Sequence, residues 1–224
     1  YHGQSSKERT PHTLFAALNV LNGKINQRAR ARLAVLVSGR GSHLMNLHQA
    51  CKSNLLSAEV VLVVTNRPDC GAMQIALDQG LTRSTLPPLK HSSEDSIDLA
   101  LREQLQHHGV DWVITAGYLK KIGPQTLDAF ENRIINIHPS LLPKYGGRGM
   151  YGRHVHEAVI AAGEQVSGAS VHYVNHCFDS GAVIAQSSVA VDDNMTAEAL
   201  AERVLRAEHT LLISALQGIL NPNE

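Results

Sequence analysis

Asn136 and His138 are two polar residues, separated by one residue, in an apolar run at residues 134 to 138. Alternate residues of a strand point to the same face of a sheet, so these two side chains are predicted to lie side by side. Pro139 favours an extended backbone at His138 and ends the strand, which places the imidazole at the carboxyl edge of a sheet. Ligands of open α/β folds bind at that edge. The spacing therefore indicates a functional site.

The pair suits acyl transfer. An amide N–H and an imidazolium N–H are both donors, and two donors can hold a carbonyl oxygen as it becomes an oxyanion. The sequence has no GxSxG motif and no cysteine beside His138, so no covalent serine or cysteine intermediate is indicated. The nucleophile is predicted to come from a substrate. A lone strand-end histidine can also make a purely structural hydrogen bond, but Asn136, Pro139 and Pro143 favour a site.

Asp179 is the candidate carboxylate, in a polar segment between two strand-like runs. A carboxylate beside His138 would favour the imidazolium form, raise the pKa of the imidazole and keep the donor charged near neutral pH. The sequence Asp-Ser-Gly at residues 179 to 181 also suits a hairpin turn, in which the aspartate would be structural. The residues alone leave both interpretations open.

A second candidate site is the turn at residues 38 to 42 (Ser-Gly-Arg-Gly-Ser), between an apolar run and a helical pattern. Glycines let the chain turn sharply, and the free N–H groups at the start of a helix favour an anion such as phosphate. Leu44 replaces the third glycine of the GxGxxG dinucleotide motif, so that motif is incomplete. A simple strand-to-helix turn is the alternative.

The elements that position these residues are strands and helices in alternation. Apolar strands are predicted at residues 33 to 37, 60 to 64, 112 to 115 and 134 to 138, and helices after Ser42 and at residues 69 to 79 and 94 to 108. Residues 170 to 174 and 183 to 191 predict an antiparallel pair, and residues 196 to 218 a long final helix. The fold class is α/β: a Rossmann-like, mainly parallel sheet flanked by helices, with an antiparallel addition near the C-terminus.

The composition argues against several other classes of protein. Lys plus Arg and Asp plus Glu number 20 each, so no broad field would attract nucleic acid or an anionic membrane. Cys51, Cys70 and Cys177 are far apart, which argues against a disulfide framework or a cysteine zinc site and favours a reducing compartment. No apolar run approaches the roughly 20 residues of a membrane span. We expect small-molecule substrates, no metal, no nucleic-acid partner and no membrane contact; the oligomeric state is left open.

Neither His154 with His156 nor His107 with His108 has the i, i+4 spacing that places two metal ligands on one helical face. His154 and His156 are predicted to have surface or packing roles. His172, within a strand, is predicted to be a hydrogen-bonded structural histidine, with a place in the site as the alternative.

Residues 1 to 31 differ from the rest of the chain because they include many basic residues and a single acidic residue, Glu8. The basic residues are Lys7, Arg9, Lys24, Arg28 and Arg30. The segment fits a piece of a transit peptide, a disordered extension or sequence that belongs to something upstream. We expect an extension at residues 1 to 31, disordered or outside the fold, and one domain at residues 32 to 224. The expected location is the cytoplasm, or an organelle if the extension is a targeting remnant.

Together the motifs resemble the folate-dependent formyltransferases and deformylases. The string Asn-Ile-His-Pro-Ser-Leu-Leu-Pro at residues 136 to 143 is highly specific to that group, and residues 168 to 174 lead to Asp179 as they do there. The likeness runs from about Arg32 to the final helix, so residues 32 to 224 are identified as a formyltransferase domain. The Gly-Ser turn at residues 38 to 42 points to the branch that serves purine synthesis.

The resemblance implies transfer of a formyl group from the co-substrate 10-formyltetrahydrofolate to the amine of 5′-phosphoribosylglycinamide, in the de novo synthesis of IMP. Asn136 and His138 would stabilise the oxygen of a tetrahedral adduct, with His138 as proton donor. Asp179 would help, through water, to move a proton from the attacking amine to the departing folate nitrogen. The ribonucleotide would contact the backbone of Gly41, Ser42 and His43 and the side chain of Glu208. The folate would contact Leu119, Lys120, Lys121, Ile122 and Asn136.

Several residues depart from the family pattern. His43 stands where asparagine is usual, His176 replaces an acid and Phe178 an aliphatic residue, and residues 148 to 155 lengthen a loop. A basic residue that contacts folate in the family has no match before residue 94. These changes bear on affinity more than on the chemistry.

Three alternatives keep some of these features. A formyltetrahydrofolate hydrolase would use water in place of the amine, and its relatives carry a further regulatory domain. A methionyl-tRNA formyltransferase would share the three residues but adds an RNA-binding domain. A non-catalytic nucleotide-binding relative would have a decayed site, against which the intact Asn136, His138 and Asp179 argue.

Overall fold

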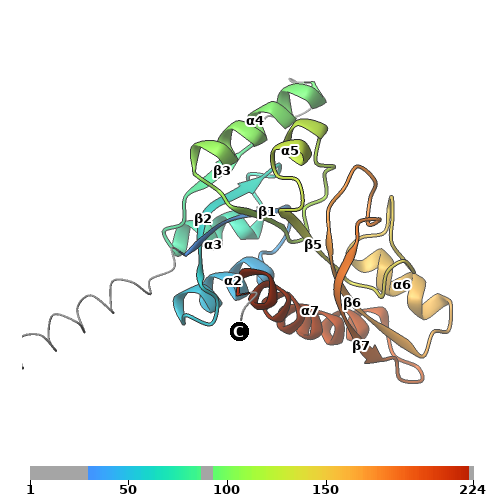
Figure 1. Cartoon of the computed structure of the whole chain (residues 1–224). Coiled ribbons are helices and arrows are strands. Elements are labelled where there is room, and N and C mark those ends of the chain that lie inside the picture. Colours follow the sequence, from blue (N-terminus) through green and yellow to red (C-terminus); the bar gives the residue numbers. More distant parts are fainter. Residues whose placement is uncertain (1–29, 87–92, 222–224) are drawn as a thin grey trace, which may run out of the picture. The chain divides into compact units, whose positions relative to one another are not determined.

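Seven strands among the described residues form one sheet at the centre of the fold (Figure 1). The computed structural model describes residues 30–86 and 93–221. The chain divides into two units, Tyr1–Arg30 and Ala31–Glu224, and the second carries the sheet. The predicted extension at residues 1 to 31 lies outside the described residues except at its last two positions.

The sheet is parallel over five strands and antiparallel at one end. Its strands are β1 (Ala31–Val37), β2 (Ala58–Thr65), β3 (Arg83–Thr85), β4 (Trp112–Thr115), β5 (Ile134–His138), β6 (Val166–Tyr173) and β7 (Val183–Ala190). They follow the order β3-β2-β1-β4-β5-β6-β7, in which β5 with β6 and β6 with β7 are the antiparallel pairs. The predicted α/β class, with its antiparallel addition, is confirmed.

Helices cover both faces of the sheet because the strands are apolar on both sides. In β1, Leu33, Val35 and Val37 face one hydrophobic cluster, Ala34 and Leu36 face the other, and none is more than 1% exposed. Residues of α2 (Ser42–Lys52), α3 (Gly71–Asp78), α6 (Arg153–Ala161) and α7 (Ala197–Leu220) complete the first cluster; those of α4 (Glu94–His107) and α5 (Pro124–Ala129) complete the second. Figure 1 accordingly shows α4 and α5 across the sheet from α2 and α7.

The structure differs from the sequence prediction at a few elements. The sequence gives no clear signal for β3, α5 or α6, and the first two are only three and six residues long. The strand predicted at residues 170 to 174 begins at Val166, because Gly168 continues the pairing with β7. A Cβ at Gly168 would lie 2.1 Å from the Ser187 carbonyl oxygen, so the glycine permits close contact of two strands instead of ending one.

Three loops meet at the carboxyl edge of the sheet, where β1 lies between β2 and β4 and the strand order reverses. Ser38, the residue after β1, ties them together. Its N–H donates to the Gly117 carbonyl (3.2 Å) and its hydroxyl donates to Asn66 Oδ1 (2.6 Å). The Leu119 N–H donates to that hydroxyl (3.1 Å). Ligands of open parallel sheets bind at such a reversal point.

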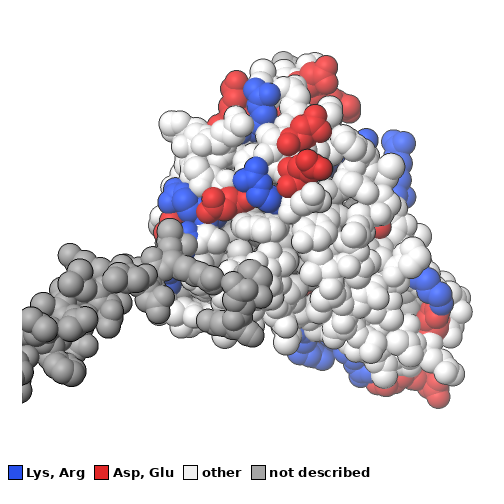
Figure 2. All heavy atoms as spheres, viewed as in Figure 1, with Lys and Arg blue, Asp and Glu red and all other residues white. Residues whose placement is uncertain are grey.

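The surface and the helices carry two further observations. On the face shown in Figure 2, basic and acidic side chains are interspersed, without a continuous field of one sign. In the described part of the chain no helix, including the 24-residue α7, is long and apolar enough to cross a membrane.

A buried aspartate of α4 caps the short helix α5. Asp98 is 5% exposed, and its carboxylate accepts hydrogen bonds from the Gln125 N–H (2.8 Å), the Thr126 N–H (3.2 Å) and the Thr126 hydroxyl (2.6 Å). Gly123 leaves room for it, since a Cβ there would lie 2.3 Å from Asp98 Cγ. The carboxylate satisfies N–H groups that the first turn of a helix leaves free, and so fixes the end of the loop from Tyr118 to Gly123.

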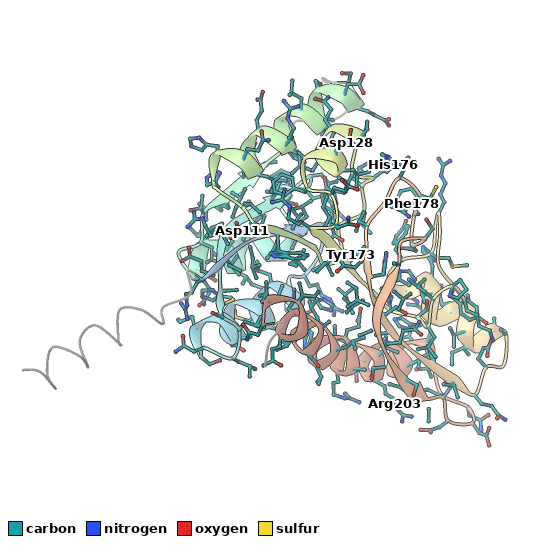
Figure 3. The ribbon with its side chains drawn as sticks, viewed as in Figure 1. Asp111, Asp128, Tyr173, His176, Phe178 and Arg203 are labelled. Atoms are coloured by element: carbon teal, nitrogen blue, oxygen red, sulfur yellow. The ribbon has the colours of Figure 1, made fainter. Side chains whose placement is uncertain are left out.

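Replacement of Asp98 by alanine is expected to lower the free energy of unfolding by roughly 2–4 kcal/mol, because buried donors lose their acceptor. Asp128→Ala is the matched control, since Asp128 is an exposed aspartate on α5 (Figure 3) and should change stability by less than about 0.5 kcal/mol. Urea denaturation of both variants measures the difference. Equal losses would contradict the capping role.

Candidate functional site

Strand β5 delivers Asn136 and His138 to the carboxyl edge of the parallel sheet. Asn136 is half-buried, and His138 is 4% exposed. β6 runs beside β5 in the opposite direction and places His172 directly across from Asn136. The edge of β5 therefore holds an amide and two imidazoles.

His138 is held in one orientation by a backbone carbonyl. Its Nε2 lies 2.8 Å from the Tyr145 oxygen. A carbonyl oxygen only accepts, so Nε2 carries a hydrogen and donates it. Nδ1 lies 3.6 Å from Asp179 Oδ2, beyond hydrogen-bond distance but within reach of an ion pair. Nδ1 is therefore the nitrogen available for proton transfer.

Asp179 reaches both histidines from the loop between β6 and β7. Its backbone is left-handed, with φ of 51°, and its Oδ2 accepts a hydrogen bond from the Gly147 N–H (2.9 Å). Oδ1 lies 3.6 Å from His172 Nε2, and Oδ2 lies at the same distance from His138 Nδ1. The sequence left two interpretations of Asp179 open, a residue of a turn and a carboxylate beside His138. The two are compatible, and both describe this residue.

Burial changes the expected electrostatics of His138. Burial lowers the pKa of His138, and His172 lowers it too; Asp179 and the Tyr145 carbonyl raise it, but the net shift is downward. The expectation that Asp179 keeps this imidazole charged near neutral pH is therefore wrong, because desolvation of the cation outweighs the attraction. Burial alone would raise the pKa of Asp179, but His172, His138 and the Gly147 N–H together lower it. Near neutral pH the pair is a carboxylate beside a neutral imidazole.

His172 belongs to the same group, although the sequence favoured a structural role for it. It is 2% exposed, its Nδ1 lies 2.8 Å from the Tyr173 carbonyl oxygen, and its Nε2 lies 3.0 Å from Asn136 Nδ2. Strand alternation placed it on one face of β6, but only the pairing of β6 with β5 brings it to Asn136. His156, predicted to have a packing or surface role, is buried on α6, and its Nδ1 has no hydrogen-bond partner among the residues that the structure describes.

A pocket adjoins these side chains. It is lined by Thr115, Tyr118, Lys120, Lys121, Ile122, Asn136, His172, Val174, Asn175, Cys177, Phe178 and Asp179. The predicted folate residues Lys120, Lys121, Ile122 and Asn136 are among them; Leu119 is not, and its side chain is 40% exposed. Phe178 and His176 lie on the loop that follows β6 (Figure 3), and Phe178 adds an apolar surface to the pocket.

The second group of predicted residues lies at the end of β1. Gly41 has φ of 88° and packs on α3, since a Cβ there would lie 2.7 Å from Ala72 Cα. No side chain in the described ranges caps α2, so the N–H groups of its first turn, from Ser42, have no capping acceptor there. His43 Nε2 lies 3.7 Å from Glu208 Oε1 of α7. The fold thus brings the glycine turn and Glu208 together.

Both titratable groups of this pair are neutral at pH 7. Burial raises the pKa of Glu208 to about 8, and burial together with His209 lowers the pKa of His43 to about 4. The His43 and His209 rings are in edge contact, with centroids 4.9 Å apart. A buried acid beside a helix N-terminus would repel an anion if it were charged, and its protonation removes that repulsion.

The chemistry open to the site follows from these groups. Asn136 supplies a hydrogen-bond donor, His138 supplies at Nδ1 a base that becomes a donor when it is protonated, and Asp179 supplies a carboxylate beside a pocket. Among the described residues, this group of side chains includes no serine or cysteine, although Cys177 is part of the lining of the adjoining pocket. Across residues 30–86 and 93–221, no set of three or more His, Cys, Asp or Glu side chains could hold a metal ion. The arrangement suits acyl transfer to a nucleophile that a substrate brings.

Comparison with known proteins identifies relatives over most of the chain. A family model described as formyl transferase matches residues 31–216. The chain is 42% identical over 200 residues to phosphoribosylglycinamide formyltransferase, chloroplastic, of Arabidopsis thaliana, an alignment that covers 89% of this chain and 68% of that protein. The chain spans 61% of the corresponding Vigna unguiculata protein, at 43% identity. The crystal structure of glycinamide ribonucleotide transformylase 1 from Symbiobacterium toebii superposes with a TM-score of 0.82 at 33% identity, covering 87% of this chain and 90% of that one.

Replacement of Asp179 by asparagine is expected to lower the pKa of His138 further, because the carboxylate that favours the imidazolium is removed while burial is kept. The titration of the His138 ring signals by NMR measures the shift. Asp193→Asn makes the same change of charge at an exposed position before α7 and should leave the His138 titration unchanged. An unchanged titration in Asp179→Asn would show that the two groups do not interact.

Proposed function

The chain belongs to the formyl transferase family, and from this we propose that it transfers the formyl group of 10-formyltetrahydrofolate to the amine of 5′-phosphoribosylglycinamide, a step of de novo purine synthesis. The observation that carries the proposal is that Asn136 and Asp179 line the pocket beside β5, while His138, which is not a lining residue, lies 3.6 Å from Asp179. The names of relatives at 42% and 43% identity support the choice of substrates.

In the proposed reaction the amine of the ribonucleotide attacks the formyl carbon. The C–N bond forms as the carbonyl electron pair moves to oxygen. The N–H of Asn136 Nδ2 that is not bonded to His172 stabilises the oxyanion, and so does His138 once its Nδ1 has taken up a proton. Collapse of the adduct then breaks the bond to the folate nitrogen, which leaves with a proton. The amine loses a proton overall and the folate nitrogen gains one, so no co-reactant is needed.

The pairing of His138 with Asp179 suits that transfer of a proton. The lowered pKa of His138 makes its imidazolium a stronger acid than an exposed histidine, and Asp179 stabilises the cation when it forms. Nδ1 is the nitrogen that can alternate between the two states, because Nε2 is bonded to the Tyr145 carbonyl. The 3.6 Å between Nδ1 and the carboxylate is short enough for Asp179 to attract the imidazolium charge directly.

The phosphate of the ribonucleotide and the folate have separate proposed sites. The phosphate would bind the free N–H groups of Gly41, Ser42 and His43 at the start of α2, with the neutral Glu208 beside its ribose. The folate would occupy the pocket along Lys120, Lys121 and Ile122, with Leu119 at its exposed margin. The amine and the formyl group would then meet at Asn136.

The comparison of substrates tests this function against its alternatives. The protein is incubated with 10-formyltetrahydrofolate, with and without 5′-phosphoribosylglycinamide, and release of tetrahydrofolate is followed. Turnover that requires the ribonucleotide supports the proposal. Turnover without it identifies a hydrolase, and no turnover in either mixture identifies a non-catalytic binding protein.

The names of two relatives bear on the compartment in which the protein is located. Two plant relatives carry the word chloroplastic in their names, and this supports an organelle, the alternative expected for residues 1 to 31, over the cytoplasm. Fluorescence microscopy of the full chain with a C-terminal fluorescent tag distinguishes the two compartments.

Replacement of His138 by alanine is expected to lower kcat by about 10²–10³ fold, because one donor to the developing oxyanion is lost. The KM for each substrate should change little, since the interaction forms in the transition state. His154→Ala is the control, because His154 is exposed on α6. Steady-state kinetics of both variants provide the measurement, and an unchanged kcat in His138→Ala would remove this residue from the mechanism.

Binding of a sugar phosphate is expected to weaken as the pH rises through 8. Glu208, with its pKa raised to about 8, is protonated below that pH and negative above it, beside the proposed phosphate site. The Kd for ribose 5-phosphate should rise about tenfold between pH 7 and pH 9, which corresponds to roughly 1.4 kcal/mol. This ligand has no amine, and its phosphate is already doubly charged over that range.

The variant Glu208→Gln should bind with a Kd that is the same at both pH values, because the amide mimics the neutral carboxyl. Glu202→Gln removes an exposed carboxylate from the same helix and should keep the pH dependence of the wild type. Isothermal titration calorimetry of the wild type and the two variants gives the three pairs of constants. A pH dependence that survives in Glu208→Gln would place its source elsewhere.

A further inference from the structure

Three polar side chains form a row across three adjacent strands. Thr115 of β4 is paired with Asn136 of β5, and Asn136 is paired with His172 of β6. Residues directly opposite one another in neighbouring strands project to the same side of a sheet. All three line the pocket. The register of the sheet therefore places a hydroxyl on one side of the Asn136 amide and an imidazole on the other.

The hydrogen bonds along this row all run in one direction. The Thr115 hydroxyl lies 2.7 Å from Asn136 Oδ1, and Asn136 Nδ2 lies 3.0 Å from His172 Nε2. His172 Nδ1 lies 2.8 Å from the Tyr173 carbonyl oxygen, which only accepts, so Nδ1 carries the hydrogen. Since the amide nitrogen of Asn136 only donates, His172 Nε2 is the acceptor for it. Each donor in the row has an acceptor, and one Asn136 N–H is left over.

A rotated amide breaks this pattern. If Oδ1 and Nδ2 exchanged places, the amide oxygen would face the lone pair of His172 Nε2 at about the same separation, and two acceptors repel each other. The Thr115 hydroxyl would have to accept from the amide and turn its hydrogen to the Ile135 carbonyl, 3.3 Å away. The amide nitrogen would then lie on the Thr115 side, and its unbonded N–H would no longer have its present position in the pocket.

We propose that Thr115 is a positioning residue, which fixes the amide of Asn136 so that one N–H of Nδ2 is presented to the reacting oxygen. This inference rests on the proposed function of Asn136. Thr115 is 5% exposed and its hydroxyl acts on that amide through Oδ1, whereas His172 opposes rotation from the other side. The hydroxyl matters because the side chain of an asparagine is free to rotate by half a turn at little cost without such partners.

Thr115→Val tests the proposal, since it removes the hydroxyl and keeps the shape of the side chain. We expect kcat to fall about 10-fold, less than the loss for a deleted oxyanion donor, with the KM of both substrates unchanged. Thr115→Ser keeps a hydroxyl at the same position and should restore at least half of the wild-type kcat. Thr210→Val makes the same substitution at an exposed position of α7 and should have no effect on kcat.

A double-mutant cycle separates a positioning role from a general structural one. In an Asn136→Ala background the substitution Thr115→Val should have no further effect on kcat, because its partner is absent. If Thr115→Val lowers kcat by the same factor in both backgrounds, or leaves it unchanged in the wild-type background, the proposal is wrong. If Asn136→Ala itself leaves kcat unchanged, the proposed function of Asn136 fails, which is a distinguishable result.

A measurement on the protein without substrates keeps the proposal testable apart from turnover. The two side-chain N–H groups of Asn136 should exchange with solvent faster in Thr115→Val than in the wild type, as followed by ¹⁵N-edited NMR, and Thr115→Ser should restore the slow exchange. Equal exchange rates in Thr115→Val and wild type would show that the hydroxyl does not hold the amide, and would overturn the inference.

Discussion

The hydrogen bond from His138 Nε2 to the Tyr145 carbonyl determines what the rest of the site can do. It commits one ring nitrogen to the backbone, and so leaves Nδ1 to face Asp179. The carbonyl is itself held in place: Tyr145 has a left-handed backbone with φ of 55°, and its hydroxyl donates to Glu164, which also pairs with Lys144. The contacts of Tyr145 and Lys144 with Glu164 at the surface therefore help to fix the orientation of the buried His138 imidazole.

Burial, more than charge, sets the protonation states of the two candidate sites. Burial lowers the pKa of His138 and raises that of Glu208, so both groups are neutral near pH 7 despite a nearby partner of opposite type. In the proposed reaction charge would form at His138 only as the reacting oxygen becomes negative, and the attraction between the two would be strong where water is excluded. A permanently charged imidazole would lose part of that difference between ground and transition state.

Sequence patterns predict features that depend on one segment and fail for those that depend on pairing between segments. The period of a strand was enough to place Asn136 and His138 on one face of β5. The position of His172 follows from the register of β6 against β5, and the cap of α5 comes from Asp98, 27 residues before Gln125. The net pKa of His138 required its burial, which no local pattern contains. The family resemblance supplied Asp179 and Glu208, which local chemistry alone left ambiguous or unmarked.

The order of the strands relates the two proposed ends of the ribonucleotide. The glycine turn follows β1 and the reacting pair ends β5, with β4 between them. Neighbouring strands lie about 4.8 Å apart, so the two strand ends are separated by roughly 10 Å. A ribose with a phosphate on one side and a glycinamide on the other can span that interval only if it crosses the end of β4, where Ala116 and Gly117 carry no long side chain. Gly117 has φ of 71°, a backbone shape that suits glycine, so the same residue that turns the chain after β4 also keeps the path between the sites open.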